Sequence, residues 1–584
     1  MAYDLTHNES YQLLGGINSK QSPYEQSLME FRDLTNLNFQ VPGSLSKRMG
    51  STLYLGATVQ GRITGLYEFV RLNGASYLIA TANTNAYNVT SSFSSIKTGL
   101  NDGALFDFVT FVDRLFMCNG ATGGFFKYDG NATSLFSLPP GATASWTATA
   151  SAGGSLVSGV TGVFLTAYGY VNDRGYFGPV SNGITVIVNG NTSAITYSGL
   201  TLNVSGYGAT AIALYRSSNG GVDLFFTTLA PIGTTTVVDP GFPLTAELSN
   251  DNLFFTMSPR YMEIYNNQLF IAGFSSAPST AYWSEIGEPE AIPPTFFAEF
   301  RTNDGDRITG MKSYAGSLVV AKQKSFHRVT GDNPDNFSLQ EISDQYGCLS
   351  NRTMVQWENY LWFLDEKGIV GYNGANIEIV SSKIQPIFDA MNVDAAIDNA
   401  CAVFNRQQNE LWFAIPCNGA TFNNCIVVYD TISKSWTKYE GLNTSALTYA
   451  RSRLSKQIPF YGGYTGNIFN FATDLKGDNG SAITCLIKTN FLAARNQTNE
   501  SQYRRFYLDV DPVIGVTQAI SVDFTSNYGT SIQASRTMYQ NPFQSRVDFG
   551  IPARSIQAIV HHVSASLSLK VNGFAFTSRF QRDK

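Results

Sequence analysis

Charged residues are scarce in this sequence. They make up 14% of its 584 residues, against about 25% in an average globular protein, so the polar surface must come from Asn, Ser, Thr, Gln and Gly. The net charge is −5, and no block of Lys and Arg occurs. A protein that grips nucleic acid through its phosphates needs such a block. The composition therefore argues against specific DNA binding, although it is compatible with a mildly acidic wall past which DNA slides.

Long apolar runs are also missing. No stretch of about 18 apolar residues occurs, so we expect no transmembrane helix. The first residues, MAYDLTHNES, lack a basic patch followed by an apolar run, and we expect no signal peptide. Segments rich in Ala, Leu, Glu and Lys, which favour long helices, are rare. The 52 Gly and the 13% share of aromatic residues instead indicate turn-rich β structure, in a chain long enough for several domains.

The cysteines form no CxxC pair. Cys417 and Cys425 lie eight residues apart and can face each other across a hairpin. The alternative is that all the cysteines are free thiols in a reduced compartment, and this is the interpretation that we favour. The six cysteines are Cys118, Cys348, Cys401, Cys417, Cys425 and Cys485.

Histidine is rare, and no HExxH, GxSxG or zinc-ligand pattern occurs. The four histidines are His7, His327, His561 and His562. Adjacent residues on a strand point to opposite faces, so His561 and His562 cannot share one metal ion. His327 follows Phe326 in a predicted strand and is given a structural role. We predict a protein that is not an enzyme, with no catalytic, cofactor-binding or metal-binding residue.

Two short segments resemble ligand-binding loops only in part. Gly305–Lys312 is similar to a phosphate-binding loop, but Met311 stands where that loop requires glycine. Asn303–Asp306 carries oxygen ligands suited to Ca²⁺, but it lacks the later Glu of an EF-hand loop. We interpret the first as strand and the second as a tight polar turn.

Glycosidases provide the strongest enzymatic alternative, because they need two carboxylates about 5–10 Å apart. The candidates are Glu285, Asp344 and Asp365, each near the edge of a predicted sheet. Ser343–Gly347 lacks the spacing and the Trp of the sialidase box, so surface carboxylates are the favoured interpretation. Tryptophans can stack on sugars, but their positions in a repeat favour the core. These tryptophans are Trp283, Trp362, Trp412 and Trp436.

A repeated strand pattern is the most informative feature of the sequence. A short turn is followed by Leu and then by apolar residues, as in Asn266–Asn267 before Gln268–Phe270. Many copies are followed by a second apolar strand that ends near Tyr and a turn, as in Val370–Gly374. Two hairpins per repeat predict a four-stranded antiparallel unit. The markers are Leu78, Leu115, Leu269, Leu318, Leu361, Leu411 and, more weakly, Ile458.

The spacing of these markers predicts a β-propeller. Successive markers are 37, 154, 49, 43, 50 and 47 residues apart, and a propeller blade takes roughly 40–50 residues. The long step becomes 43 when a separate module of 111 residues, 142–252, is removed. Seven markers predict six or seven blades. The closing strand is expected before residue 63 or after residue 474, because an open ring would leave unpaired edges.

The sequence thus predicts an all-β fold with five parts. Residues 1–62 form an N-terminal arm, 63–141 and 253–474 form the propeller, and 142–252 form an inserted β-sandwich similar to fibronectin type III modules. Residues 475–584 form a C-terminal β domain. The arm either wraps a neighbouring copy or packs on its own chain. Lys47 and Arg48 contact an acidic neighbour or, as is more usual, are solvated.

The arm also carries a resemblance to a known family. Leu14–Asn18 is followed by Ser22–Pro23, Asn36–Phe39 and Gly43–Gly50. This order resembles the opening of tail nozzle proteins of short-tailed bacteriophages, the family of tail tubular protein B. The propeller, the module around Tyr215–Ser217 and the C-terminal domain extend the resemblance over nearly the whole chain.

The resemblance implies a structural virion protein located in the tail. It implies a ring, commonly of six copies, that lies below the portal and adaptor rings, retains the DNA and conducts it during ejection without binding it specifically. Tail fibres or spikes are implied as further partners, and no cofactor is implied. Two other interpretations stay open: a head-completion stopper or fibre-carrying hub, and a glycan-binding or glycan-cleaving propeller.

Overall fold

The structure is a computed structural model of the chain. It describes residues 6–13, 15–142, 145–200, 204, 206–248, 252–452, 456–494, 498–513, 518–540 and 545–580. Strands dominate these residues, which confirms the predicted all-β fold class. The chain divides into two compact units: residues 1–68, 76–95 and 345–584 form one, and residues 69–75 and 96–344 form the other.

Outside the inserted module, seven four-stranded antiparallel units recur along the described residues, and we number them blades one to seven in chain order. Blade one is β6 (Ile63–Val70), β7 (Ser76–Ala82), β8 (Asn85–Asn88) and β9 (Ser94–Lys97). Blade two is β10 (Asp107–Phe111), β11 (Arg114–Cys118), β12 (Phe126–Tyr128) and β13 (Thr133–Leu135). Blade three is β21 (Tyr261–Tyr265), β22 (Gln268–Ala272), β23 (Thr280–Trp283) and β24 (Phe297–Glu299). Blade four is β25 (Ile308–Tyr314), β26 (Ser317–Lys322), β27 (Phe326–Thr330) and β28 (Ser338–Ser343).

Blades five, six and seven lie in the first compact unit. Blade five is β29 (Val355–Trp357), β30 (Tyr360–Asp365), β31 (Gly368–Tyr372) and β32 (Ile377–Ile379). Blade six is β33 (Cys401–Asn405), β34 (Glu410–Ile415), β35 (Cys425–Asp430) and β36 (Ser435–Glu440). Blade seven is β37 (Ala446–Arg451), β38 (Gln457–Gly462), β39 (Asn467–Ala472) and β5 (Gly50–Thr58). Short helices α1 (Gln385–Asp389) and α2 (Val393–Asn399) connect blades five and six.

The repeated marker, Leu in six blades and Ile458 in blade seven, lies on the second strand of each blade. Leu115, Leu269 and Leu318 are fully buried on β11, β22 and β26. The turns before these strands have positive φ angles at both central residues, for example 46° at Asn266 and 59° at Asn267. Such turns match the twist of the two strands that they join. The pattern thus predicted the central hairpin of the blades correctly.

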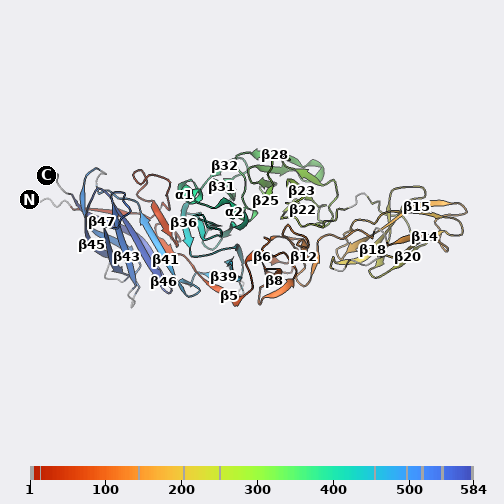
Figure 1. Ribbon diagram of the computed structural model, residues 1–584, viewed down its shortest axis with the longest axis horizontal. Helices are drawn as coiled ribbons and strands as arrows, with labels where there is room; N and C mark the ends of the chain where they lie inside the picture. The colour runs from red at the N-terminus through yellow and green to blue at the C-terminus, as the bar shows by residue number, and fades with distance from the viewer. Residues whose placement is uncertain are drawn as a thin grey trace, which may run out of the picture. The chain divides into compact units, whose positions relative to one another are not determined.

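Strand β5 completes blade seven from more than 400 residues away in the sequence. It pairs antiparallel with β39, with Leu53 opposite Phe469 (Figure 1). Without it, β39 would present an unpaired edge at the end of the blade series. The closing strand therefore comes from before residue 63, one of the two places that the sequence predicts.

The inserted module is a β-sandwich (Figure 1), and the part of it that the structure describes contains seven strands. One sheet contains β14 (Thr147–Ser151), β17 (Ala194–Ser198) and β20 (Thr236–Asp239). The other contains β16 (Ile184–Val188), β15 (Gly162–Asn172), β18 (Ala209–Arg216) and β19 (Phe225–Pro231). Trp146 packs between Tyr168 and Tyr197 in the core, with ring centroids 5.2 and 6.2 Å away. Alternating apolar residues on both sheets create this core.

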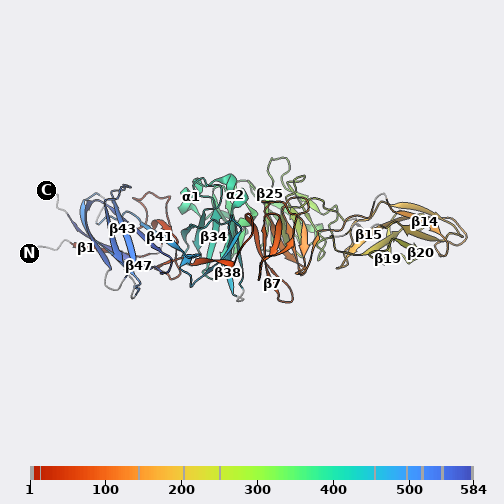
Figure 2. The same ribbon diagram turned by 60° about the horizontal axis from the view of Figure 1, so that its bottom comes forward.

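The C-terminal domain takes strands from both ends of the chain (Figure 2). One sheet contains β1 (Thr6–Tyr11), β3 (Leu37–Asn38), β4 (Leu45–Lys47), β47 (Lys570–Phe580), β42 (Ser501–Val510) and β45 (Arg546–Ala553). The other strands are β2 (Phe31–Thr35), β40 (Gly477–Asp478), β41 (Ser481–Thr489), β46 (Ile556–Ser564), β43 (Ala519–Ser526) and β44 (Ala534–Tyr539). Phe31, Phe506, Phe524 and Phe576 lie in one shared core.

The N-terminal segment is therefore part of its own chain's sheets. Strand β1 pairs with β47, β2 pairs with β41 and with β36 of blade six, and β5 belongs to blade seven. Of the two arrangements expected for this segment, the described residues show the one in which it packs on its own chain. Residues 1–5 and Leu14 lie outside the described residues.

Candidate binding groove and buried polar sites

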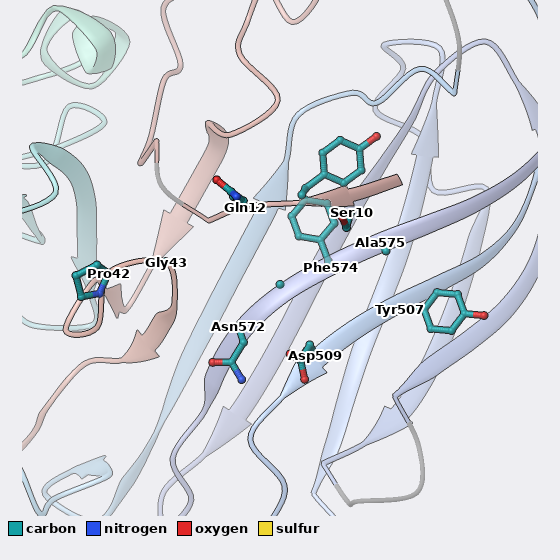
Figure 3. A pocket seen from close by; sticks show the side chains of 11 residues that line it. Ser10, Gln12, Pro42, Gly43, Tyr507, Asp509, Asn572, Phe574 and Ala575 are labelled. Atoms are coloured by element: carbon teal, nitrogen blue, oxygen red, sulfur yellow. The ribbon is translucent and has the colours of Figure 1, made fainter. Parts of the chain in front are cut away.

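A groove of about 620 Å³ lies on the C-terminal domain (Figure 3). It forms where the edge of β47 is left uncovered. Strand β4 pairs with β47 as far as Val571, and β1 pairs with it only from Phe574 onward. The backbone at Asn572 and Gly573 lies between these two pairings, and the turn at Pro42 borders the gap. The groove is thus a consequence of how two N-terminal strands share one C-terminal strand.

The aromatic side chains near the groove lie on two faces of the sheet, because Tyr11 and Phe574 pair with each other and Phe574 pairs with buried Leu508, which places both rings on the core side. The ring of Tyr11 stacks on Phe574 with centroids 5.2 Å apart and planes inclined by 22°. Tyr507 and Asp509 project from β42 on the face opposite Phe506 and Leu508, which are buried in the core. This alternation follows from the pleat of the strand. Figure 3 shows Phe574 and Asp509 between Pro42 on one side and Tyr507 on the other.

Polar groups complete the groove. Ser10, Gln12 and Asn572 contribute a hydroxyl and two amides, and Asp509 contributes an exposed carboxylate. The Asn572 amide donates to the Asp511 carboxylate at 2.9 Å, and this hydrogen bond orients the Asn572 side chain. The same hydrogen bond, together with Lys570, lowers the pKa of Asp511. Among the described residues that line the groove, none is Lys, Arg or His. Sequence reasoning missed this site because its residues come from four distant segments.

The side chains of His327, His561 and His562 are described by the structure. His562 is buried, and burial together with nearby Lys47 lowers its pKa to about 4, so that it is neutral at pH 7. His561, its neighbour on β46, lies 3.5 Å from Asp523 on the other face, as the strand geometry predicts. His327 is buried and lies 3.0 Å from the Ser325 hydroxyl. The side chain of His7 lies outside the described residues.

The Asn303–Asp306 turn already holds a cation, the ammonium group of Lys322. This fully buried group lies 2.7 Å from both carboxylate oxygens of Asp304. It also donates to the backbone carbonyls of Phe300 and Arg301 at 3.1 and 2.9 Å. The oxygens that suggested Ca²⁺ are therefore occupied by a side chain. Gly305–Lys312, the segment similar to a phosphate loop, continues into β25.

The three carboxylates proposed for a glycosidase differ in their surroundings. Asp344 is exposed, and Glu285 is half-buried, with its pKa raised by burial and by Glu288. Asp365 is buried, which corrects its interpretation as a surface carboxylate. It accepts hydrogen bonds from the backbone N–H groups of Gly347 and Lys367 at 3.0 and 2.8 Å, so it stabilises the turn after β30.

The tryptophans are core residues, as favoured. Trp283, Trp362, Trp412 and Trp436 are all at least nine-tenths buried, so none forms an exposed platform for a sugar.

The six cysteines are buried free thiols, which is also the favoured interpretation. Cys417 and Cys425 nevertheless contact each other, and this contact and burial raise the pKa of Cys425. Among the described residues, no group of three or more His, Cys, Asp or Glu side chains is placed to hold a metal ion.

Lys47 and Arg48 are buried, so the prediction that they are solvated is wrong. The Arg48 guanidinium binds both carboxylate oxygens of Asp478 and donates to Asn36 at 2.8 Å. The Lys47 ammonium donates to the carbonyls of Ser564 and Leu567 at 2.6 and 3.1 Å. Both side chains join the N-terminal segment to the C-terminal domain. The sequence hides this because Asp478 is 430 residues away from Arg48.

A buried carboxyl group, that of Glu410, lies in blade six. Glu410 on β34 accepts from the Trp412 indole at 2.7 Å and from the Tyr439 hydroxyl at 3.1 Å. Burial raises its pKa to about 8, and these hydrogen bonds only partly oppose the shift. The Arg48 guanidinium lies 5.7 Å from the centre of the Tyr439 ring. Glu410 therefore changes protonation near neutral pH inside a packed blade.

A second buried ion cluster lies in the other compact unit. Glu290 pairs with the Lys127 ammonium, lies 3.7 Å from Arg114, and accepts from the Asn172 amide at 3.1 Å. Arg114 also pairs with Asp173 of the inserted module. Burial lowers the pKa of Lys127, while Glu290 opposes the shift. The cluster joins the inserted β-sandwich to blade two and to the segment after β23.

No family model and no curated protein matches this sequence. Among solved structures, the WD40 domain of Pan2 from Neurospora crassa matches with a TM-score of 0.24 and 8% identity, covering 73% of this chain and 94% of that one. An exo-β-1,3-galactanase from Phanerochaete chrysosporium matches with a TM-score of 0.20 and 9% identity, and the match covers 71% of this chain and 100% of that one.

No helix in the described part of the chain is long and apolar enough to span a bilayer.

Proposed function

We propose that this chain is a non-enzymatic structural protein of a bacteriophage tail. In this proposal, copies of the chain form a ring, commonly of six, below the portal and adaptor rings. The ring retains the packaged DNA and conducts it during ejection. The blades of each copy close into a β-propeller, and fibres or spikes attach to the same assembly.

The support comes from the segment that carries the family resemblance. Its motif residues form buried hydrogen bonds within the N-terminal segment and, at Asn36, to distant parts of the chain. Asn18 is buried and donates to Glu30 at 2.7 Å. Asn36 donates to the Thr484 carbonyl at 2.8 Å and accepts from the backbone of Glu440 at 3.0 Å. Through Asn36, the motif therefore connects β36 of blade six with β41 of the C-terminal domain.

Two glycines of the motif are required by close backbone approach. A Cβ atom on Gly16 would lie 2.8 Å from the backbone nitrogen of Trp436, and its φ of +66° favours glycine. A Cβ atom on Gly50 would lie 2.2 Å from the carbonyl oxygen of Gly477. Larger residues at either position would push the segment away from the sheets that it joins.

This connected architecture suits a component that must resist the force of packaged DNA. Strands β1 and β47, from the two terminal regions of the chain, share one sheet, and β5 of the N-terminal segment completes blade seven. The charge distribution fits as well, since several basic side chains are engaged in internal pairs rather than displayed for phosphate binding. DNA would pass such a surface without being held.

Labelling of virions tests the proposal. Antibodies raised against the purified chain, coupled to gold particles, should mark the tail at the vertex through which DNA leaves. Labelling of the capsid faces would contradict it. Labelling confined to the head–tail junction or to the fibre bases would favour the stopper or the hub over the nozzle.

A further inference from the structure

We propose that the side chains of Lys127 and Asn172 react with each other to form an amide bond, which joins blade two covalently to the inserted β-sandwich. The bond links Nζ of Lys127 to Cγ of Asn172 and releases ammonia. Lys127 lies on β12, and Asn172 is the last residue of β15. The third participant is Glu290, from the segment between β23 and β24, which carries the protons of the reaction.

One carboxylate brings the two reacting side chains together. Oε2 of Glu290 pairs with Nζ of Lys127, and Oε1 of Glu290 accepts from Nδ2 of Asn172 at 3.1 Å. Because both oxygens belong to one group, the amine and the amide meet at that group. All three residues lie in the second compact unit. Reactants held together in this way react as if their concentrations were far above those of free molecules.

The carbonyl group of Asn172 is prepared for attack by an amine. Its Oδ1 accepts from the backbone N–H groups of Arg174 and Tyr176 at 2.9 and 3.0 Å. The backbone N–H of Asn172 in turn donates to the Tyr176 carbonyl at 3.1 Å, which closes the turn that carries both donors. Two fixed N–H donors stabilise the negative charge that develops on Oδ1 when an amine adds to Cγ.

Burial activates the amine and protects the site from water. Lys127, Asn172 and Glu290 are 2%, 2% and 5% exposed. Burial lowers the pKa of Lys127, and Arg114 acts in the same direction, while Glu290 opposes the shift. The neutral amine is the nucleophilic form of lysine, so desolvation favours the attack. The exclusion of water also means that hydrolysis of the Asn172 amide does not compete with it.

Glu290 acts as base and then as acid. It accepts a proton from the Lys127 ammonium group, and the neutral amine attacks Cγ of Asn172. Glu290 donates this proton to Nδ2 as the bond between Cγ and Nδ2 breaks, and it accepts a second proton from Nζ. The freed ammonia takes up the second proton and leaves as ammonium. The new amide keeps one proton on Nζ, Glu290 returns to its carboxylate form, and no oxidant or cofactor is consumed.

The mass of the full chain tests this proposal. The purified protein is kept folded near neutral pH for a day, denatured and measured by mass spectrometry. We expect a mass about 17 Da below that of the sequence, which corresponds to one ammonia. Trypsin should fail to cut after Lys127, whose amine is blocked, so residues 115–174 should remain one peptide of the lower mass. Further cleavage with chymotrypsin should leave two peptides joined through Lys127 and Asn172.

Glu290→Gln should abolish the loss of mass, and trypsin should then release residues 115–127. Glu288→Gln is the matched control, because Glu288 is exposed in the same segment, and it should keep the lower mass. The proposal is overturned if the wild-type chain has the full mass of its sequence, if the loss of ammonia maps to other residues, or if Glu290→Gln keeps the joined peptides. The wild-type peptides decide the matter even if Glu290→Gln fails to fold. These outcomes do not depend on where antibodies label the virion, so they are separate from the failure of the proposed tail function.

Discussion

Arg48 and Asp478 form a two-pronged ion pair, with nitrogen–oxygen distances of 3.0 and 2.5 Å, between the N-terminal segment and the start of the C-terminal domain. The guanidinium side chain is 1% exposed. It also donates to the carbonyl of Met49 at 2.9 Å and to Asn36, so its donors are used within the chain. A buried arginine with these partners orders the chain around it.

Replacing Arg48 should destabilise the protein strongly. Arg48→Met leaves the Asp478 carboxylate without its partner, and the loss of one member of a buried pair costs about 3–5 kcal/mol. We expect a lower urea midpoint in the transition that reports on the first compact unit. Arg505→Ala is the control, since Arg505 is 47% exposed and its pair with Asp548 lies at the surface, where such a pair contributes about 0–1 kcal/mol. Equal effects of the two substitutions would show that the Arg48 pair does not join the segments.

Glu410 should make stability depend on pH. Its pKa is about 8 in the folded chain and about 4.3 when unfolded. Between these values the folded chain holds a proton that the unfolded chain has released. The free energy of unfolding therefore falls as pH rises, by up to about 1.4 kcal/mol per pH unit, and the effect levels off above the folded pKa.

Glu410→Gln removes this titration while keeping an oxygen that accepts from Trp412 and Tyr439. Relative to the wild type, the variant should gain stability steadily between pH 5 and pH 8, as measured by urea unfolding at each pH. Glu378→Gln, a change at an exposed residue of β32, should leave the pH profile unchanged. A constant difference between wild type and Glu410→Gln across this range would refute the assignment.

Lys322 should make the Asn303–Asp306 turn insensitive to calcium. The ammonium group occupies the position among the carboxylate and carbonyl oxygens, so added Ca²⁺ should not change the Tm of the wild type. Lys322→Met should destabilise the protein by about 3 kcal/mol, because Asp304 and two carbonyls lose their donor. Lys324→Met, at an exposed position nearby, is the control. A rise in the wild-type Tm on adding Ca²⁺ would contradict the occupied site.

Glu290 should hold the inserted β-sandwich to the blades. Glu290→Gln leaves the Lys127 ammonium buried beside a neutral amide, with an expected cost of about 3 kcal/mol. Limited proteolysis should then cut faster in the segments that connect residues 142–252 to the blades. Glu299→Gln, at an exposed residue of β24, should not change the cleavage rate. Unchanged cleavage in Glu290→Gln would mean that the cluster does not fix the module.

The sequence predicted those parts of the structure that depend on local pattern. A Leu after a tight turn marks a blade's central hairpin because turn chemistry and strand burial both act over a few residues. Contacts between distant segments were not predictable in this way. The sequence predicted that Lys47 and Arg48 are solvated, because charged residues usually are. The residues next to them in the sequence give no sign that Asp478, 430 residues away, is the partner of Arg48. The groove was hidden for the same reason, since β1, β42 and β47 meet only in the folded domain.

The position of the chain in the virion tests the central claim most directly. Electron cryomicroscopy of the phage particle that carries this chain should show its blades, inserted sandwich and C-terminal domain repeated around the tail axis, in a ring below the portal and adaptor with DNA in its bore. Density for the chain as a single copy away from the axis, or its absence from the intact particle, would contradict the account.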